Sequence, residues 1–223
     1  MTDGLVLHHS PLTRSMRSLW LLYELGVPFE VVTYPFGPEL RTPEYLALSP
    51  LGRTPLLEDG PTRLFESGAI CEYLCEQYDP GMLWRWPGHP DRAAWLQWLH
   101  FAETMGQHLA ALTQAHIAIR DPADRPVIVM KLEARRLEKT LEVVGAALDG
   151  RDHLLPGGFS AVDIGIGWSV HVAQWFTRLE AFPAVASYHR RLSGRAAFRK
   201  ALPAPGTETF LAEPFYAVPA PPS

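Results

Sequence analysis

One stretch of this chain, residues 49–75 (SPLGRTPLLEDGPTRLFESGAICEYLC), constrains the fold more than any other. It contains Thr54-Pro55 directly ahead of an apolar pair, Leu56-Leu57. A proline cannot donate a hydrogen bond to a sheet ladder, so this one predicts the first position or the edge of a strand. An ordered bond before proline at such a bend is a candidate for the cis form. That form would turn the backbone N–H and C=O of residue 54 outward, where an extended peptide can pair with them.

The end of the stretch predicts a helix whose start can bind a ligand. Glu66-Ser67-Gly68 lies between a short strand and apolar residues at helical spacing, and Ser67 is placed to cap that helix. The unpaired N–H groups and partial positive charge of a helix N-terminus favour a carboxylate. Glu66 beside them suits an ammonium group. A ligand that carries an ammonium group, a carboxylate and a peptide backbone would satisfy the whole stretch.

The first 80 residues are predicted to form a small α/β domain. The Glu-Asp-Gly sequence at 58–60 indicates the turn of a hairpin. The first two strands of this domain are expected to pair in parallel through a right-handed crossover. The expected elements are, in order, a strand at 5–9, a helix at 14–25 closed by Gly26, a strand at 29–34, a short helix from 43, strands at 54–57 and 63–65, and a helix after Ser67. This β-α-β-α-β-β-α order is thioredoxin-like.

The remainder of the chain is predicted to be helical. Proline and glycine concentrate at 79–90, and beyond them long helices are expected at 93–119 and 124–148. Ser160 and Asp163 form a capping-box pattern ahead of an apolar helix that extends to about residue 179. A proline-rich tail follows, for which an extended state, disorder and docking of residues 213–216 all stay open. The expected domains are a thioredoxin-like domain at 1–80, a linker at 81–90, an all-helical domain at 91–205 and a tail at 206–223.

The run Leu-Gly-Arg-Thr-Pro-Leu-Leu-Glu-Asp-Gly at 51–60, followed by Leu-Phe-Glu-Ser-Gly-Ala-Ile at 64–70, resembles the glutathione-binding half of the cytosolic glutathione S-transferase family. That family carries a cis-proline and a Glu-Ser pair at this spacing, and it joins a thioredoxin-like domain to a helical one. The resemblance extends over roughly residues 5–202 and implies glutathione as co-substrate and a homodimer. A capped helix and a proline-initiated strand without a ligand are the alternative. The implied glutathione-binding residues are Arg53, Thr54, Pro55, Glu66 and Ser67.

If the ligand is glutathione, its thiol needs activation, because an unperturbed thiol has a pKa of about 8.5 and only the thiolate is a strong nucleophile. A hydroxyl donor and a helix N-terminus both favour the anion. Ser10 lies just after the first expected strand, and its spacing to Arg14 resembles that of serine-type members of the family. We therefore predict Ser10 as the activating residue, with Thr13 and then Ser15 as substitutes. The alternative is that Ser10 only shapes the turn before Pro11.

Missing residue types narrow the subclass. No tyrosine precedes Tyr23 and no cysteine precedes Cys71, which argues against the tyrosine-type and cysteine-type members of the family. The chain therefore resembles a bacterial-type, serine-type member similar to the theta and delta classes. His8 and His9, at the end of the first strand, are interpreted as histidines with structural hydrogen bonds, and a place in the active site is the alternative.

The electrophile is expected to bind in a cleft between the two domains. One wall would include Leu12, and the other would be the long helix at 93–119. A polar stripe at spacing i, i+3, i+4, i+7 and i+8 interrupts the apolar pattern of that helix. A solvated face and a subunit interface are alternative interpretations of the stripe. Its residues are His100, Glu103, Thr104, Gln107 and His108.

Composition excludes several classes of protein. The formal net charge of -4 over 223 residues, with no long basic run, gives no case for binding nucleic acid or an anionic membrane. The N-terminus shows no basic segment followed by an apolar one, and no run of about eighteen apolar residues occurs, so a cytoplasmic protein is expected. The histidines and cysteines form no zinc motif, so no metal is expected. Cys71 and Cys75 are interpreted as reduced packing residues, with a redox pair as the alternative.

Together these features predict a glutathione S-transferase whose activated thiol attacks a small, largely apolar electrophile. A second hypothesis uses the same site for isomerisation, dehalogenation or ether cleavage, in which glutathione attacks and is released again. A third is a non-catalytic glutathione-binding scaffold of the same fold. The natural electrophile does not follow from residue spacing, because spacing does not fix the side-chain directions in the pocket.

Overall fold

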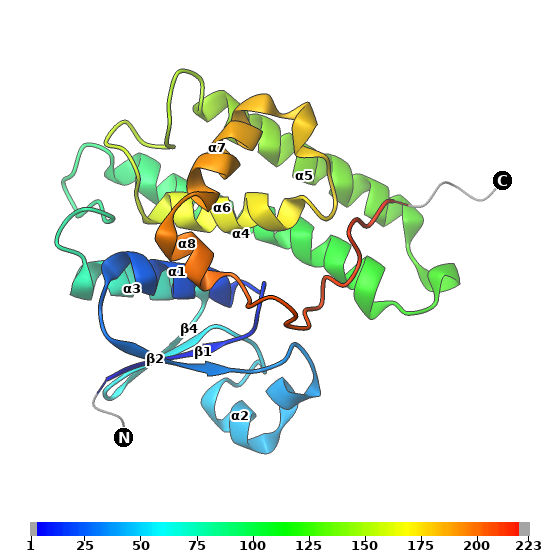
Figure 1. The fold of residues 1–223 in the computed structure, drawn as a ribbon, viewed down its shortest axis with the longest axis horizontal. Coiled ribbons are helices and arrows are strands. Elements are labelled where there is room, and N and C mark those ends of the chain that lie inside the picture. Colours follow the sequence, from blue (N-terminus) through cyan, green and yellow to red (C-terminus); the bar gives the residue numbers. More distant parts are fainter. Residues whose placement is uncertain (1–3, 219–223) are drawn as a thin grey trace. The chain divides into compact units, whose positions relative to one another are not determined.

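The computed structural model describes residues 4–218, which divide into two compact units. The N-terminal unit comprises the described residues up to Arg92 together with Ser193–Phe210. The helical unit comprises Ala93–Leu192 and the described residues from Leu211 onward. Figure 1 draws both units, with most of their helices and strands labelled.

The N-terminal unit is built on a four-stranded sheet. Its elements are β1 (Leu5–His9), α1 (Ser15–Leu25), β2 (Phe29–Thr33), the 3-10 turn η1 (Pro38–Arg41), α2 (Pro43–Leu48), β3 (Leu56–Asp59), β4 (Thr62–Phe65) and α3 (Ser67–Tyr78). The strand order is β2-β1-β3-β4, in which β1 and β2 are parallel and the other two pairs are antiparallel. In Figure 1, α1 and α3 lie on one side of the sheet and α2 on the other. This is the predicted thioredoxin-like order.

The apolar residues of this unit explain why the predicted elements form. Leu7 of β1 is 0% exposed and lies opposite Val31 of β2 and Leu57 of β3, so the central strand is buried between two neighbours. The helix α1 ends as expected, because Gly26 adopts a left-handed φ of 67° and its N–H donates to the Leu22 carbonyl.

The short helix α8 (Ala196–Ala201) also belongs to the N-terminal unit, where it packs on α1. The Phe198 ring meets the Trp20 ring edge-on with centroids 4.8 Å apart, and both side chains are buried. Arg195, directly ahead of α8, donates to the Glu24 carboxylate at 2.6 and 2.8 Å. The chain thus returns to the N-terminal unit at Ser193. The sequence-based domain boundaries instead assign all of residues 91–205 to one helical domain.

The helical unit is built on four long helices. They are α4 (Arg92–Thr113), which continues as a π-helical turn η2 at Gln114–Ala118, α5 (Val127–Ala147), α6 (Ala161–Ala173) and α7 (Pro183–Ser193), with 3-10 turns η3 at Pro122–Asp124 and η4 at Leu179–Ala181. Both predicted long helices are present. The second begins at Val127, because Pro126 stands ahead of it, and α6 ends at Ala173 rather than near 179.

The start of α6 is held by a buried acid. Ser160 and Asp163 form the predicted capping box. Asp163 is 0% exposed, and its carboxyl oxygens accept hydrogen bonds from the N–H groups of Leu154 and Ser160 and from the Tyr188 hydroxyl, at 3.1, 2.8 and 2.8 Å. These donors compensate the burial of a polar group and tie α6 to α7.

The tail docks on the helical unit through the segment that ends at Tyr216. The Tyr216 N–H donates to the Trp175 carbonyl at 2.7 Å, and the Tyr216 ring lies 5.7 Å from Phe176 between ring centroids. The Arg178 guanidinium lies 3.9 Å above the Phe215 ring. Docking is therefore correct for residues 213–216, while residues 219–223 of the expected tail lie outside the described residues.

Two local predictions in the N-terminal unit are wrong by a residue or two. The strand β3 runs through Asp59, so the hairpin turn falls at Gly60-Pro61, where Gly60 has a φ of 53°. Ser67 is the first residue of α3 rather than its cap, and Glu66 occupies the cap position without a side-chain hydrogen bond.

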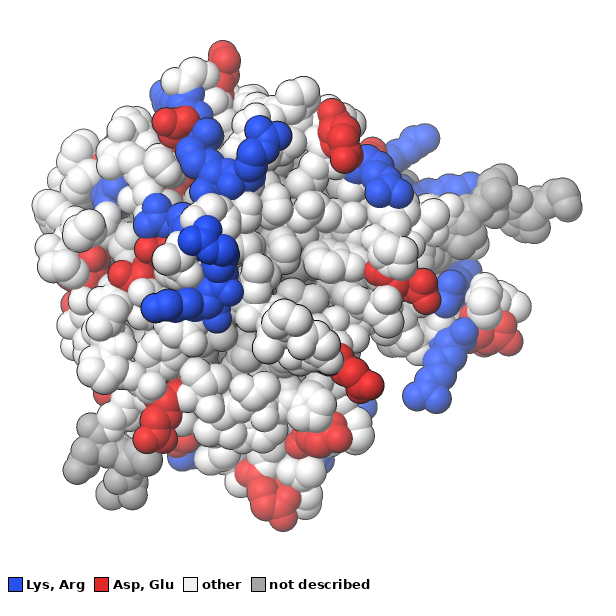
Figure 2. Space-filling model, in the orientation of Figure 1, with Lys and Arg blue, Asp and Glu red and all other residues white. Residues whose placement is uncertain are grey.

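Among the described residues, no helix is long and apolar enough to cross a membrane, and no group of three or more His, Cys, Asp or Glu side chains could hold a metal ion. Cys71 and Cys75 are free cysteines. On the face shown in Figure 2, acidic and basic side chains both occur and neither covers the face.

Candidate functional site

The N-terminus of α3 presents the two residues predicted to hold the charged end of a peptide ligand. Glu66 is exposed and has a φ of 76°, a left-handed value that is uncommon for a residue with a side chain. Ser67 is 5% exposed, and its hydroxyl oxygen accepts a hydrogen bond from Arg17 Nη1 at 3.3 Å. A guanidinium group therefore lies beside the hydroxyl at the positive end of this helix.

The Thr54-Pro55 bond is cis, as predicted, and the loop before it is fixed by two hydroxyl groups. Tyr45 and Ser49 both donate to the Arg53 carbonyl oxygen, each at 2.9 Å. Burial, with a smaller effect of the nearby Tyr34, raises the pKa of Tyr45 to about 12, so the phenol stays a donor at neutral pH. The ladders of β3 begin at Leu56, so Thr54 lies beyond the paired part of the sheet.

His8 lies near this loop, because its partner in the β1–β3 ladder is Leu56, the residue after Pro55. Its ring nitrogens bond the Tyr34 hydroxyl at 3.0 Å and the Glu58 carboxylate at 2.9 Å. The Tyr34 and Tyr45 rings lie 4.8 Å apart between centroids. The hydrogen bond from His8 is the main cause that lowers the pKa of Glu58, and Arg63 contributes to the same effect. The interpretation of His8 as a histidine with structural hydrogen bonds is confirmed.

The three predicted hydroxyl residues cluster between β1 and α1 but differ in exposure. Ser10 and Ser15 are both 0% exposed, whereas Thr13 is half-buried. Among the described residues, the Ser10 hydroxyl has no hydrogen-bond partner. Thr13 Oγ1 lies 2.8 Å from Ser15 Oγ and 3.2 Å from the hydroxyl of Thr54. Thr13 therefore joins the α1 end of the site to the loop before β3.

The backbone around these hydroxyls forms a tight turn. Leu12 has a left-handed φ of 61° and a buried side chain. The N–H of Thr13 donates to the Ser10 carbonyl at 3.2 Å, and the N–H of Ser15 donates to Thr13 Oγ1 at 3.3 Å. Thr13 rather than Ser10 thus supplies the side-chain acceptor at the start of α1.

The polar stripe lies on α4 as predicted, but its members have different environments. Glu103 is half-buried, and His100, Thr104 and Gln107 are exposed. His108 is 9% exposed, and its Nδ1 lies 2.6 Å from the carboxylate of Glu133 on α5. Participation of Leu12 and the stripe residues in electrophile binding stays a prediction.

Glu133 on α5 is itself buried, at 7% exposed. Burial acts to raise its pKa, but hydrogen bonds from His108 and Arg136 outweigh burial, and the pKa lies below its ordinary value. No signal in the sequence pairs His108 with a residue on another helix.

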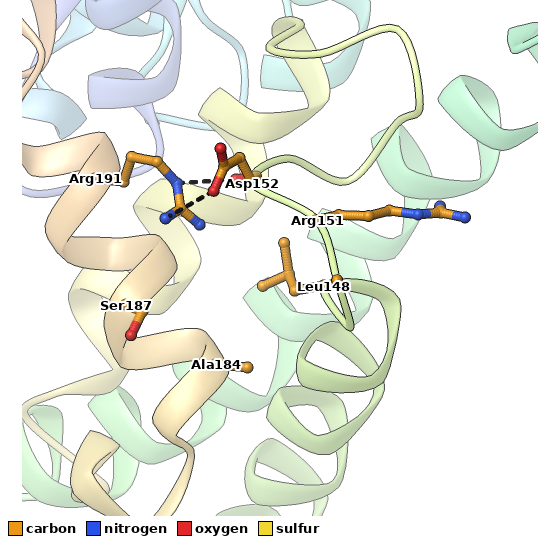
Figure 3. A pocket seen from close by; sticks show the side chains of 7 residues that line it. Leu148, Arg151, Asp152, Ala184, Ser187 and Arg191 are labelled. Atoms are coloured by element: carbon orange, nitrogen blue, oxygen red, sulfur yellow. Dashed lines mark hydrogen bonds and ion pairs between the residues drawn. The ribbon is translucent and has the colours of Figure 1, made fainter.

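A separate pocket lies within the helical unit, and its residues were not predicted to have a function. Figure 3 shows the Arg191–Asp152 ion pair beside it and Arg151 directed away from that pair. Asp152 therefore neutralises Arg191 at the edge of this pocket. It is lined by Leu148, Gly150, Arg151, Asp152, Ala184, Ser187 and Arg191.

The chain is similar to known proteins in both sequence and structure. Residues 3–76 match the family described as "Glutathione S-transferase, N-terminal domain". Glutathione S-transferase 3 of Schizosaccharomyces pombe is 38% identical over 44% of this chain, and the match spans 41% of that relative's own length. Glutathione S-transferase F10 of Arabidopsis thaliana is 35% identical over 67% of this chain and 72% of the relative.

Among solved structures, glutathione transferase URE2P6 of Phanerochaete chrysosporium, in complex with oxidized glutathione, superposes with a TM-score of 0.79. It is 25% identical, and the match covers 90% of this chain and 95% of that one. These relatives are a plant F-series protein and fungal proteins. They do not support the theta-like or delta-like subclass predicted from the sequence.

Proposed function

The chain belongs to the glutathione S-transferase family, and from this premise we propose that its N-terminal unit binds glutathione and activates the thiol for attack on a small, largely apolar electrophile. The observation that carries the proposal is the position of the start of α1, together with Thr13 just ahead of it, between the two predicted binding elements. Thr13 Oγ1 lies 3.2 Å from the Thr54 hydroxyl, and Arg17 Nη1 lies 3.3 Å from the Ser67 hydroxyl. A peptide that spans from Thr54 to Ser67 would pass the N-terminus of α1.

Each part of glutathione has matching chemistry along this path. The γ-glutamyl ammonium group suits the exposed Glu66 carboxylate, and its carboxylate suits Ser67 and the N-terminus of α3. The cysteinyl backbone suits Thr54, which lies beyond the paired part of β3. The glycine carboxylate suits the exposed guanidinium of Arg53.

Thr13 is the best placed of the three candidate hydroxyls to donate to the glutathione sulfur. Its side chain is half-buried next to Thr54, while the side chains of Ser10 and Ser15 are fully buried. A donated hydrogen bond and the N-terminus of α1 both favour the thiolate over the thiol. The thiol proton then passes to solvent, the thiolate forms the S–C bond, and the leaving group departs with its electron pair. Thr13 thus takes the role that we first predicted for Ser10.

The finer assignments follow the same premise. We propose a homodimer of the cytoplasm with a hydroxyl-type active site. The names of the plant and fungal relatives favour a class close to theirs over the theta and delta classes. The three hydroxyls between β1 and α1 support the hydroxyl-type mechanism.

The test is the ultraviolet thiolate absorbance of bound glutathione, titrated against pH. We expect the wild type to lower the thiol pKa below its free value of about 8.5, and Thr13→Val to raise it by about one unit, which is the loss of one hydrogen bond to a charged group. If Ser10→Ala raises the pKa instead, Ser10 is the donor as first predicted. Glutathione that binds to the wild type with no shift at all would favour the scaffold over the transferase.

A further inference from the structure

His9 is a buried histidine that the proposed mechanism does not use. It ends β1, is 5% exposed, and places Nδ1 2.8 Å from Ser15 Oγ. Ser15 Oγ in turn lies 2.8 Å from Thr13 Oγ1. His8, the residue before His9, bonds Tyr34 and Glu58 instead. A continuous chain of side chains therefore connects His9 to the hydroxyl next to Thr54.

The number of protons in this chain limits how it can be arranged. Each hydroxyl has one proton and can accept two hydrogen bonds. Ser15 Oγ already accepts from the Ser10 N–H at 3.0 Å, and the N–H of Ser15 donates to Thr13 Oγ1. Thr13 can direct its single proton to the Ser10 carbonyl, to Ser15, to Thr54 or to a ligand. Ser15 can direct its own proton to Thr13, to His9 or to the Ser10 carbonyl at 3.1 Å. Thr13 keeps its proton free of Ser15 only when Ser15 donates to Thr13.

We propose that His9 is a positioning residue for the thiol-activating hydroxyl. With its proton on Nδ1, His9 donates to Ser15 Oγ, Ser15 donates to Thr13 Oγ1, and Thr13 keeps its own proton for the glutathione sulfur. In the other tautomer, Ser15 donates to His9, and Thr13 loses the donor that holds its proton toward the ligand. This inference rests on the proposed function, because it needs a thiolate next to Thr13.

Two physical arguments support the direction of the relay. Burial lowers the pKa of His9 to about 4, so the ring is neutral at physiological pH and carries only one N–H. The choice is then between two tautomers. An anion at the Thr13 end favours the arrangement in which every hydrogen bond points toward it, because hydrogen bonds in a chain polarise one another.

The experiment measures the thiol pKa of bound glutathione in Ser15→Ala, His9→Phe and His9→Asn. We expect Ser15→Ala and His9→Phe each to raise the pKa by about 0.5 to 1 unit, a roughly three- to tenfold loss of thiolate below the pKa. His9→Asn should restore most of the shift, because its amide N–H can take the place of Nδ1–H. The double variant of Ser15→Ala with His9→Phe should add little to either single change.

A purely structural role for His9 would give a different result. It would lower stability and glutathione affinity but leave the thiol pKa unchanged. His171→Phe is the matched control, since burial also lowers the pKa of His171 to about 4 but this side chain contacts His189 in the helical unit. We expect the control to leave the thiol pKa as in the wild type.

The outcomes separate the two proposals. If Thr13→Val raises the thiol pKa while Ser15→Ala and His9→Phe do not, the relay is wrong and the proposed function stands. If the wild type fails to bind glutathione or to shift its thiol, both proposals are wrong. Because Ser15→Ala removes a single oxygen atom, it tests the relay even where His9→Phe prevents folding.

Discussion

The hydroxyls of Tyr45 and Ser49 donate to the same atom, the Arg53 carbonyl oxygen, and so orient the peptide ahead of Thr54. Neither residue is among those predicted to bind glutathione. Each acts instead on the conformation of the loop that would bind the cysteinyl backbone. Small polar contacts of this kind decide the precision of a binding site, because a loop that moves pays an entropy cost on binding.

Tyr45→Phe tests this role at the residue scale. The change keeps the ring packed on Tyr34 but removes one donor to the Arg53 carbonyl, so we expect glutathione affinity to fall about three- to tenfold, equivalent to roughly 1 kcal/mol. Calorimetric titration with glutathione measures the change. Tyr73→Phe is the matched control, because the Tyr73 hydroxyl donates to Asp59 and not to the loop. Asp59 still accepts a hydrogen bond from the Tyr78 hydroxyl in this variant. Equal affinities for both variants would contradict the role of Tyr45.

At the scale of elements, α8 stabilises a unit that is distant from it in the chain. It covers α1 through the contact of Phe198 with Trp20 and the ion pair of Arg195 with Glu24. The helix α1 also carries Arg17 and begins two residues after Thr13. The rigidity of the candidate site therefore depends on residues near the C-terminus.

Phe198→Ala should lower the free energy of unfolding by about 3–5 kcal/mol, because it removes a fully buried ring. Amide hydrogen exchange should show the loss of protection in α1, although residue 198 follows the helical unit in the chain. Phe215→Ala is the matched change, since this ring lies under Arg178 of the helical unit. We expect Phe215→Ala to reduce amide protection in the helical unit and not in α1. Loss of protection spread evenly over both units in each variant would refute this assignment.

At the scale of the whole molecule, the two units are interleaved along the chain. The chain leaves the N-terminal unit after Arg92, returns at Ser193 and enters the helical unit again at Leu211. Each unit also contains a histidine whose pKa is lowered by burial, the buried His9 in the first and the half-buried His171 in the second. Their effects on stability should add, since His9 bonds Ser15 and His171 bonds His189.

The free energy of unfolding should therefore decrease as the pH is lowered through a defined window. Burial lowers the pKa of His9 and of His171 to about 4, whereas an unfolded histidine titrates at about 6.5. The unfolded state takes up protons first, so their contribution is present above about pH 6.5 and is lost as the pH falls toward about 4. The loss should reach up to about 3 kcal/mol for His9 and less for the half-buried His171.

Urea unfolding between about pH 7 and about pH 5 measures this slope. Glu58 and Glu133 have lowered pKa values, so their contributions are lost at lower pH. Burial raises the pKa of Asp163, which acts with the opposite sign, so the comparison with a histidine variant is what isolates the histidine. His171→Phe should make the slope shallower. A profile that is flat in the wild type, or unchanged in the variant, would exclude the histidines as its cause.

Much of the fold follows from local sequence signals. Gly26 ends α1, Thr54-Pro55 precedes β3, and Ser160 with Asp163 begins α6, all as predicted. In each case the residues that form the contact lie within a few positions of one another. The physical signal is therefore contained in a short segment.

The sequence by itself determined the fold class, and it predicted both a binding stretch at 49–75 and a group of three hydroxyls at the start of the first helix. Only the tertiary structure decided which hydroxyl is accessible, why Glu133 is buried and to which unit α8 belongs. The reason is that burial and hydrogen bonding depend on segments far apart in the chain. His108 meets Glu133 on another helix, and Phe198 meets Trp20 across most of the sequence, so no local pattern records either contact.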